Sequence, residues 1–122
     1  MTDTKLLDGC SVLVLDDDYF LADDTRAALE DAGATVVGPF GSTDDALASL
    51  DEGSPEYAIL DLNLGSGPDF EIARAMKARG VPTVLVSGYD ATIIPPDLAG
   101  TPRLQKPITR AGLIRAVTEL VG

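Results

Sequence analysis

The fold is decided by the stretch VLVLDDD at residues 12–18, in which four consecutive apolar residues run into three aspartates. An apolar run without alternation is typical of a strand that is buried on both faces of a parallel sheet. The run YAIL at residues 57–60 has the same character and is followed by Asp61. Carboxylates gathered at one end of a sheet repel each other and resist loss of water, so we expect them to hold a cation.

Short apolar strands alternate with helical patterns along the whole chain. This alternation predicts an α/β fold in which right-handed crossovers wind helices over both faces of a parallel sheet. We expect strands at residues 11–15, 35–38, 57–60, 83–86 and 103–105, and helices at about residues 19–32, 43–50, 68–79 and 110–121. Because residues 90–102 contain three prolines, we expect a loop with at most one or two helical turns there.

The helical patterns also predict which side chains are buried. Leu21 would lie on the buried face of the first helix, and Val121 on that of the last. Four aromatic residues are interpreted as packing residues: Tyr19, Phe40, Tyr57 and Phe70.

The composition excludes several classes of function. Twenty acidic against nine basic residues give a net charge of −11, which disfavours direct binding to nucleic acid or to an anionic membrane. The absence of histidine removes the commonest general base and the commonest zinc ligand. The single cysteine, Cys10, allows no internal disulfide, and no signal peptide or membrane-spanning stretch is evident. We therefore expect one cytoplasmic domain over residues 1–122.

Four groups follow predicted strands at their carboxyl ends, where ligands collect in open parallel sheets. They are the aspartates at residues 16–18, Asp61, Ser87 and Lys106. Carboxylates and a backbone carbonyl suit Mg²⁺, while a lysine and a serine can donate hydrogen bonds to phosphoryl oxygens. Asp61, which is ionised at neutral pH, can attack phosphorus without a general base.

From about Val12 to Leu120 the chain resembles the receiver domain of a bacterial response regulator. The resemblance rests on LDD at residues 15–17, DLNL at 61–64, SG at 87–88 and KP at 106–107. It implies a three-layer, doubly wound, flavodoxin-like fold of five parallel strands in the order 2-1-3-4-5. Here the helix between strands four and five would be short or degenerate.

The resemblance also implies a role in a two-component system or phosphorelay. A histidine kinase or a phosphotransfer protein would phosphorylate Asp61, which would switch binding of an unknown downstream protein or relay the phosphate onward. The chain would be a phosphoacceptor that assists its own phosphorylation and dephosphorylation, and not an enzyme. Because it ends directly after the last predicted helix, we expect no output domain.

Individual roles follow from the same resemblance. Asp17, Asp61 and the backbone carbonyl of Asn63 would bind Mg²⁺ directly, and Asp16 would bind it through water. Ser87 would bond one phosphoryl oxygen, and Lys106 would pair with another. The Lys106–Pro107 peptide bond would be cis.

Three features depart from the usual receiver pattern. Arg103 stands where receivers carry an aromatic residue, and Gly65 stands where proline is common. A Gly-Tyr pair, Gly88 and Tyr89, follows the strand-four hydroxyl, as in a subgroup of single-domain regulators. We therefore expect the loop at residues 89–100, rather than an aromatic switch, to report phosphorylation.

Two alternatives remain open from the residues alone. Asp16 and Asp18 form a D-x-D pattern, which is typical of haloacid-dehalogenase phosphohydrolases with Asp16 as the nucleophile, although the later acidic pair of that family is missing. The chain could instead be a pseudo-receiver, an interaction module that is never phosphorylated. Taken singly, each acid, the serine and the lysine would be ordinary turn or surface residues, and Asp18 is interpreted as an acid at a helix N-terminus.

Overall fold

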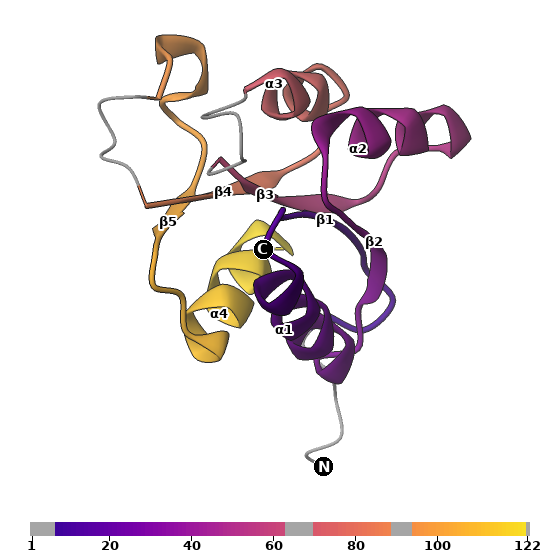
Figure 1. The fold of residues 1–122 in the computed structure, drawn as a ribbon, viewed down its shortest axis with the longest axis vertical. Coiled ribbons are helices and arrows are strands. Elements are labelled where there is room, and N and C mark those ends of the chain that lie inside the picture. Colours follow the sequence, from indigo (N-terminus) through magenta and orange to yellow (C-terminus); the bar gives the residue numbers. More distant parts are fainter. Residues whose placement is uncertain (1–6, 63–69, 89–93, 122) are drawn as a thin grey trace.

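The computed structural model describes residues 7–62, 70–88 and 94–121. Five parallel strands form one sheet in the order β2-β1-β3-β4-β5, which confirms the predicted topology (Figure 1). The strands are β1 (Ser11–Leu15), β2 (Thr35–Phe40), β3 (Tyr57–Asp61), β4 (Thr83–Ser87) and β5 (Arg103–Gln105).

The helices cover both faces of this sheet. In the described residues they are α1 (Tyr19–Asp31), α2 (Thr43–Ser49), α3 (Glu71–Ala78) and α4 (Arg110–Val121), together with the short 3₁₀ helices η1 (Leu50–Glu52) and η3 (Pro96–Leu98). Figure 1 shows α1 and α4 on one face and α2 and α3 on the other, so the predicted three-layer sandwich is confirmed. Over residues 94–102 of the connection between β4 and β5, η3 is the only helical element.

The core has two halves, one on each face of the sheet. Leu13 and Leu15 of β1 pack toward α2 and α3, whereas Val12 and Val14 pack toward α1 and α4. Both sets of side chains are buried. This explains why the strand reads as a continuous apolar run rather than as an alternating pattern.

The second strand extends two residues beyond its predicted end, to Phe40. Its pairing with β1 is irregular between Leu13 and Leu15, and Gly38 adopts a positive φ of 100°. The backbone carbonyl of Phe40 accepts a hydrogen bond of 2.9 Å from the backbone N–H of Asp16. Pro39 does not end the strand because β2 lies at the sheet edge, where a missing N–H is tolerated.

Three burial predictions are wrong. Leu21 and Val121 are 43% and 42% exposed, and Tyr19 is 77% exposed. The buried stripe of α1 instead contains Ala22, and Tyr19 and Leu21 lie beside that stripe in the first turn. Val121 is the last residue of α4, where the helix ends.

No helix in the described part of the chain has the length and hydropathy of a membrane span.

Candidate functional site

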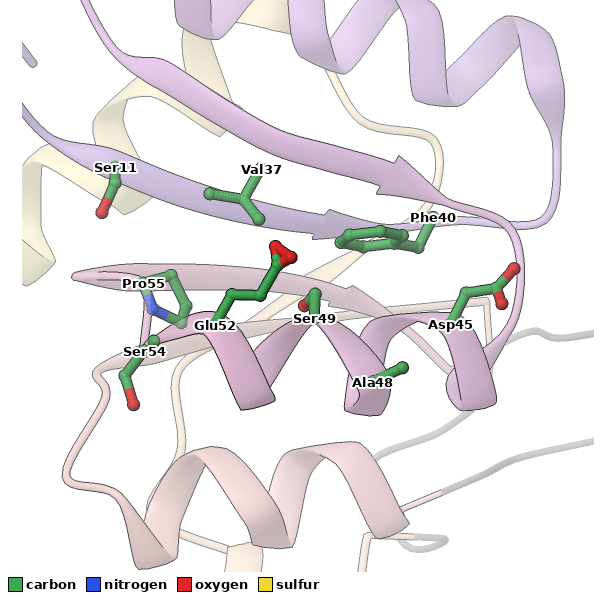
Figure 2. A pocket seen from close by; sticks show the side chains of 10 residues that line it. Ser11, Val37, Phe40, Asp45, Ala48, Ser49, Glu52, Ser54 and Pro55 are labelled. Atoms are coloured by element: carbon green, nitrogen blue, oxygen red, sulfur yellow. The ribbon is translucent and has the colours of Figure 1, made fainter.

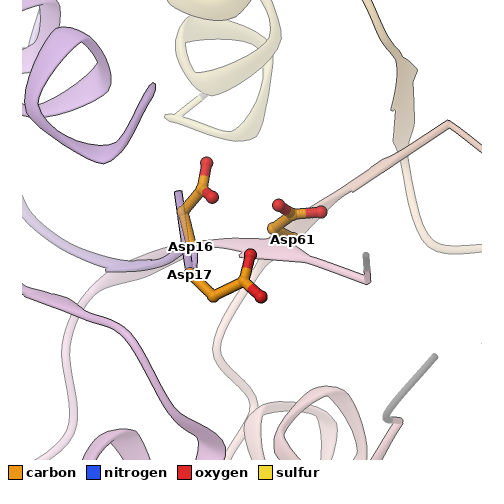
Figure 3. A group of neighbouring side chains, drawn as sticks. All are labelled: Asp16, Asp17 and Asp61. Atoms are coloured by element: carbon orange, nitrogen blue, oxygen red, sulfur yellow. The ribbon is translucent and has the colours of Figure 1, made fainter. Parts of the chain in front are cut away.

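Three carboxylates come together at the carboxyl ends of β1 and β3. One oxygen each from Asp16, Asp17 and Asp61 lies within 4.8 Å of the other two, and Figure 3 shows the side chains converging. The register explains this arrangement, because Leu15 is paired with Leu60 and the residues that follow them are therefore neighbours. Oxygen ligands at this spacing could hold a hard divalent cation. The fourth predicted ligand, Asn63, lies outside the described residues.

Lys106 provides the positive charge of the site. Its Nζ donates a hydrogen bond of 2.9 Å to Oδ2 of Asp61, although the two residues are 45 positions apart. The Asp61 side chain is only 2% exposed, and that of Lys106 is 25% exposed. The backbone continues the pairing of β4 and β5, since the N–H of Lys106 donates to the carbonyl of Ser87. The Lys106–Pro107 bond is cis, as the resemblance implied.

Ser87 is fully buried at the end of β4. The register pairs Val86 with Asp61 on one side and Ser87 with Gln105 on the other. Ser87 therefore also lies at the carboxyl ends of the strands, between the strand that carries Asp61 and the strand that leads to Lys106. Gly88 follows as an exposed residue, and Tyr89 lies outside the described residues, as do residues 63–69, which include Gly65.

The electrostatics of the site favour an added cation. The pKa of Asp16 is raised to about 7, mainly by burial and also by the nearby charge of Asp61 and a hydrogen bond between the two carboxyl groups. The backbone N–H of Asp18, 2.9 Å from Asp16 Oδ1, and the charge of Lys106 both lower the pKa, but by less. Without a cation, Asp16 is therefore partly protonated near neutral pH, and a metal ion would compete with that proton.

The third aspartate of the run has a structural role. Asp18 is the N-cap of α1, and its Oδ1 accepts hydrogen bonds from the backbone N–H groups of Phe20 and Leu21 at 3.0 and 3.1 Å. This agrees with its interpretation as a helix-terminal acid.

An exposed apolar patch beside the acids was not predicted from the sequence. Tyr19 and Phe20 are each 77% exposed, and their rings form an edge-to-face pair with centroids 5.7 Å apart. We call these two residues and Leu21 the α1 patch. The sequence does contain a signal of this exposure. Asp23 and Asp24 follow Tyr19 and Phe20 by four positions, so on a helix the aromatic residues share a face with two acids.

Comparison with known proteins identifies the family. The family model described as the response regulator receiver domain matches residues 12–118. This chain belongs to that family. The receiver domain thus has its predicted fold and takes part in two-component signalling, and the match does not favour a haloacid-dehalogenase phosphohydrolase.

Proteins of known structure resemble this chain over most of its length. SdrG from Sphingomonas melonis is 31% identical, with 93% of this chain and 97% of SdrG covered and a TM-score of 0.78. A receiver protein from Sinorhizobium medicae is 29% identical, with 92% and 94% covered and a TM-score of 0.78. The sensory transduction protein LytT of Bacillus cereus is 32% identical over 82 residues, which are 65% of this chain. The match spans only 33% of LytT, about a third of that relative's length.

Proposed function

We propose that this receiver accepts a phosphoryl group on Asp61 in a reaction that requires Mg²⁺. The observation that carries the proposal is the position of one buried carboxylate between two further acids and an ammonium group. Asp16, Asp17 and Asp61, with the carbonyl of Asn63 that the family pattern implies, would hold the ion. When bound, Mg²⁺ neutralises charge on the transferring phosphoryl group.

The residues at this sheet edge supply the other requirements of phosphoryl transfer. A carboxylate oxygen of Asp61 forms a bond to phosphorus as the bond between phosphorus and the donor nitrogen breaks. The electron pair stays on that nitrogen, which then takes a proton. Lys106 and Ser87 donate hydrogen bonds to the phosphoryl oxygens, and Gly88 leaves room because it has no side chain. Water later hydrolyses the aspartyl phosphate, so the chain is a phosphoacceptor rather than an enzyme with a turned-over substrate.

The donor is a histidine kinase or a histidine phosphotransfer protein. It has to bring its phosphohistidine into bonding distance of Asp61, so its surface must contact the elements around the acids. The α1 patch starts three residues after Asp16 and offers the exposed aromatic surface that protein interfaces favour. Phosphorylation then engages Lys106 with a phosphoryl oxygen in place of its bond to the unphosphorylated carboxylate of Asp61. We infer that this exchange biases the receiver toward binding a downstream protein.

Labelling with acetyl phosphate and Mg²⁺ tests the phosphoacceptor. We expect one phosphoryl group per chain by intact mass spectrometry, no label in Asp61→Asn, and normal labelling in the control Asp24→Asn. Label on Asp16 would instead support the phosphohydrolase alternative. Complete absence of label in the unmodified chain would support the pseudo-receiver.

A second experiment separates the α1 patch from the chemistry. We expect Phe20→Ser to slow phosphotransfer from a protein donor but to leave labelling by acetyl phosphate unchanged. Equal slowing with both donors would show that the patch supports the phosphoacceptor itself rather than the docking of its partner.

A further inference from the structure

A second concave surface lies away from the acidic site. It is a groove of about 700 Å³ between β2, α2 and η1. Figure 2 shows its apolar side chains and the two acidic side chains that project from the helical side. We call it the β2–α2 groove; its apolar residues are Val37, Phe40, Ala48 and Pro55, and its acids are Asp45 and Glu52. Its volume is in the range of pockets that hold small ligands or side chains.

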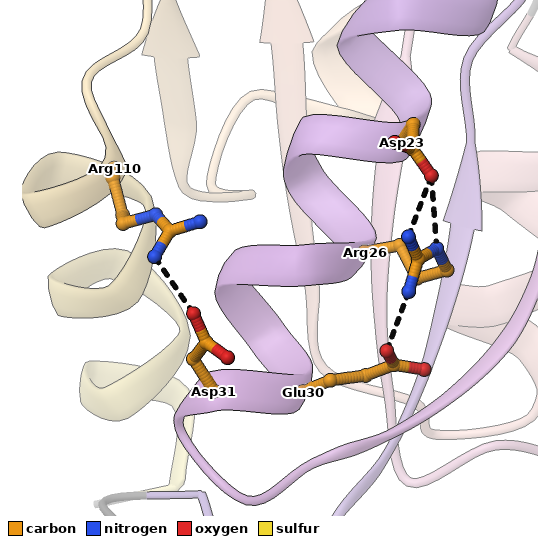
Figure 4. Close-up of polar contacts among 5 residues, drawn as sticks. All are labelled: Asp23, Arg26, Glu30, Asp31 and Arg110. Atoms are coloured by element: carbon orange, nitrogen blue, oxygen red, sulfur yellow. Dashed lines mark hydrogen bonds and ion pairs between the residues drawn. The ribbon is translucent and has the colours of Figure 1, made fainter.

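The two acids of the groove have no ion pair within residues 7–62, 70–88 and 94–121. Two acids of α1 differ, as Figure 4 shows: Arg26 pairs with both Asp23 and Glu30. Arg79, which is not among the lining residues, donates to the hydroxyl of Ser54 at 2.9 Å and forms an ion pair with neither acid within residues 7–62, 70–88 and 94–121. The groove therefore combines uncompensated negative charge with an apolar floor.

We propose that the β2–α2 groove binds an extended segment of a partner protein that carries two basic residues with aliphatic residues between them. Asp45 lies in α2 and Glu52 in η1, seven positions apart, which is about 11 Å at the rises of an α-helix and a 3₁₀ helix. In an extended segment of polyproline II conformation, residues three positions apart lie on the same side and are separated by a similar distance, about 9 Å. The basic side chains pair with the two carboxylates, and the aliphatic residues cover the side chains of Val37 and Phe40.

The negative charge of the groove favours a basic segment over a second copy of the chain or a nucleic acid. A second copy of the chain carries the same net charge of −11, and nucleic acid is an anion, so the acids of the groove repel both. The position of β2 at the edge of the sheet leaves one side of the groove without a neighbouring strand, so an extended segment can enter from there. The groove residues are separate from the three carboxylates of the phosphoacceptor site.

Binding is tested with a capped, glycine-flanked peptide whose core is Arg-Leu-Leu-Arg, titrated into the full chain and followed by NMR. We expect shifts of the backbone amides of Val37, Phe40, Ala48 and Gly53. Two control peptides each lack one recognition element: Arg-Ser-Ser-Arg has no apolar residues, and Gln-Leu-Leu-Gln has no charge. Both should bind more weakly by about fivefold or more. Equal binding of Arg-Ser-Ser-Arg would overturn the proposal, because it would reduce recognition to charge alone.

Matched variants locate the binding surface. The double variant Asp45→Asn with Glu52→Gln should weaken binding about fivefold. The control, Asp44→Asn with Asp51→Asn, removes the same charge from the same two helices outside the groove, and should weaken binding by less than about twofold. Ala48→Trp, at an exposed position of α2, should block the groove and abolish the amide shifts. Equal losses from the two double variants, or shifts centred on the α1 patch, would overturn the assignment.

Discussion

Lys106 Nζ lies 2.9 Å from Asp61 Oδ2, so an ion pair at the acidic site joins β3 to the residue after β5. The carboxylate is almost completely buried, whereas the ammonium group is a quarter exposed. Because of this difference in exposure, the charge of Asp61 needs the ion pair for its stabilisation more than the charge of Lys106 does. Removal of the lysine would leave a buried negative charge among other carboxylates.

We therefore expect Lys106→Ala to lower the free energy of unfolding of the metal-free protein by about 2 kcal/mol at pH 8. The expected loss is smaller than for a fully buried ion pair because the ammonium group is partly hydrated. Urea unfolding measures the change, with Arg115→Ala, an exposed cation on α4, as the control. A loss no larger than that of the control would show that the pair contributes little to stability.

The raised pKa of Asp16 predicts the pH dependence of stability. Its pKa is about 7 in the folded protein against an ordinary 3.8, so the folded state binds the proton more tightly. The stabilisation that this tighter proton binding gives to the folded state is present in full below about pH 4 and is lost as the pH rises through 7. Because the group is only half-buried, we expect about 2 kcal/mol from this carboxyl group without metal.

Mg²⁺ should reverse that trend, because the ion competes with the proton of Asp16. We expect the ion to raise the midpoint of thermal unfolding more at pH 8 than at pH 5. In Asp61→Asn, NMR titration should show a lower pKa for Asp16 that still exceeds its ordinary value, since burial is the largest cause of the shift. An equal effect of Mg²⁺ at both pH values would contradict this account.

Gly38 is predicted to be required for the path of β2. A Cβ there would lie 2.7 Å from the backbone nitrogen of Phe40, and the φ of 100° is unfavourable for any other residue. Gly38→Ala should therefore cost about 2 kcal/mol or more and weaken Mg²⁺ binding, because Phe40 holds the backbone of Asp16. Gly41→Ala is the matched control, since a Cβ there meets nothing within 4 Å. Similar melting temperatures for the two variants would contradict the prediction.

Asp18 is predicted to stabilise α1 without binding the metal. Asp18→Ala removes the acceptor for two backbone N–H groups and should lower stability by about 1 kcal/mol. Asp18→Asn should retain most of that stability, because asparagine also caps helices. Calorimetric titration should give the same Mg²⁺ affinity within about threefold for both variants, since the cluster of carboxylate oxygens is formed by other residues. A much larger loss of affinity would assign Asp18 to the metal site.

Several features of the fold could be read from local sequence because they depend on neighbouring residues. The continuous apolar runs predicted central strands. The start of α2 is local in the same way, because the hydroxyl of Ser42 caps it by accepting from the N–H of Asp45. Exposure was less predictable. Tyr19 has the apolar character of a core residue, yet it lies outside the buried stripe, because the rotation of a helix about its axis is set by its packing against the sheet.

The sequence by itself determined that Asp16, Asp61, Ser87 and Lys106 each follow a strand at its carboxyl end. The apolar run of each strand and the polar residue after it are neighbours in the chain, so a local pattern is enough to predict them. Only the tertiary structure decided that Lys106 bonds Asp61, that burial raises the pKa of Asp16, and that a groove opens beside β2. These depend on strand order, helix packing and distance from solvent. Such quantities arise between residues that are far apart in the chain, and no local pattern encodes them.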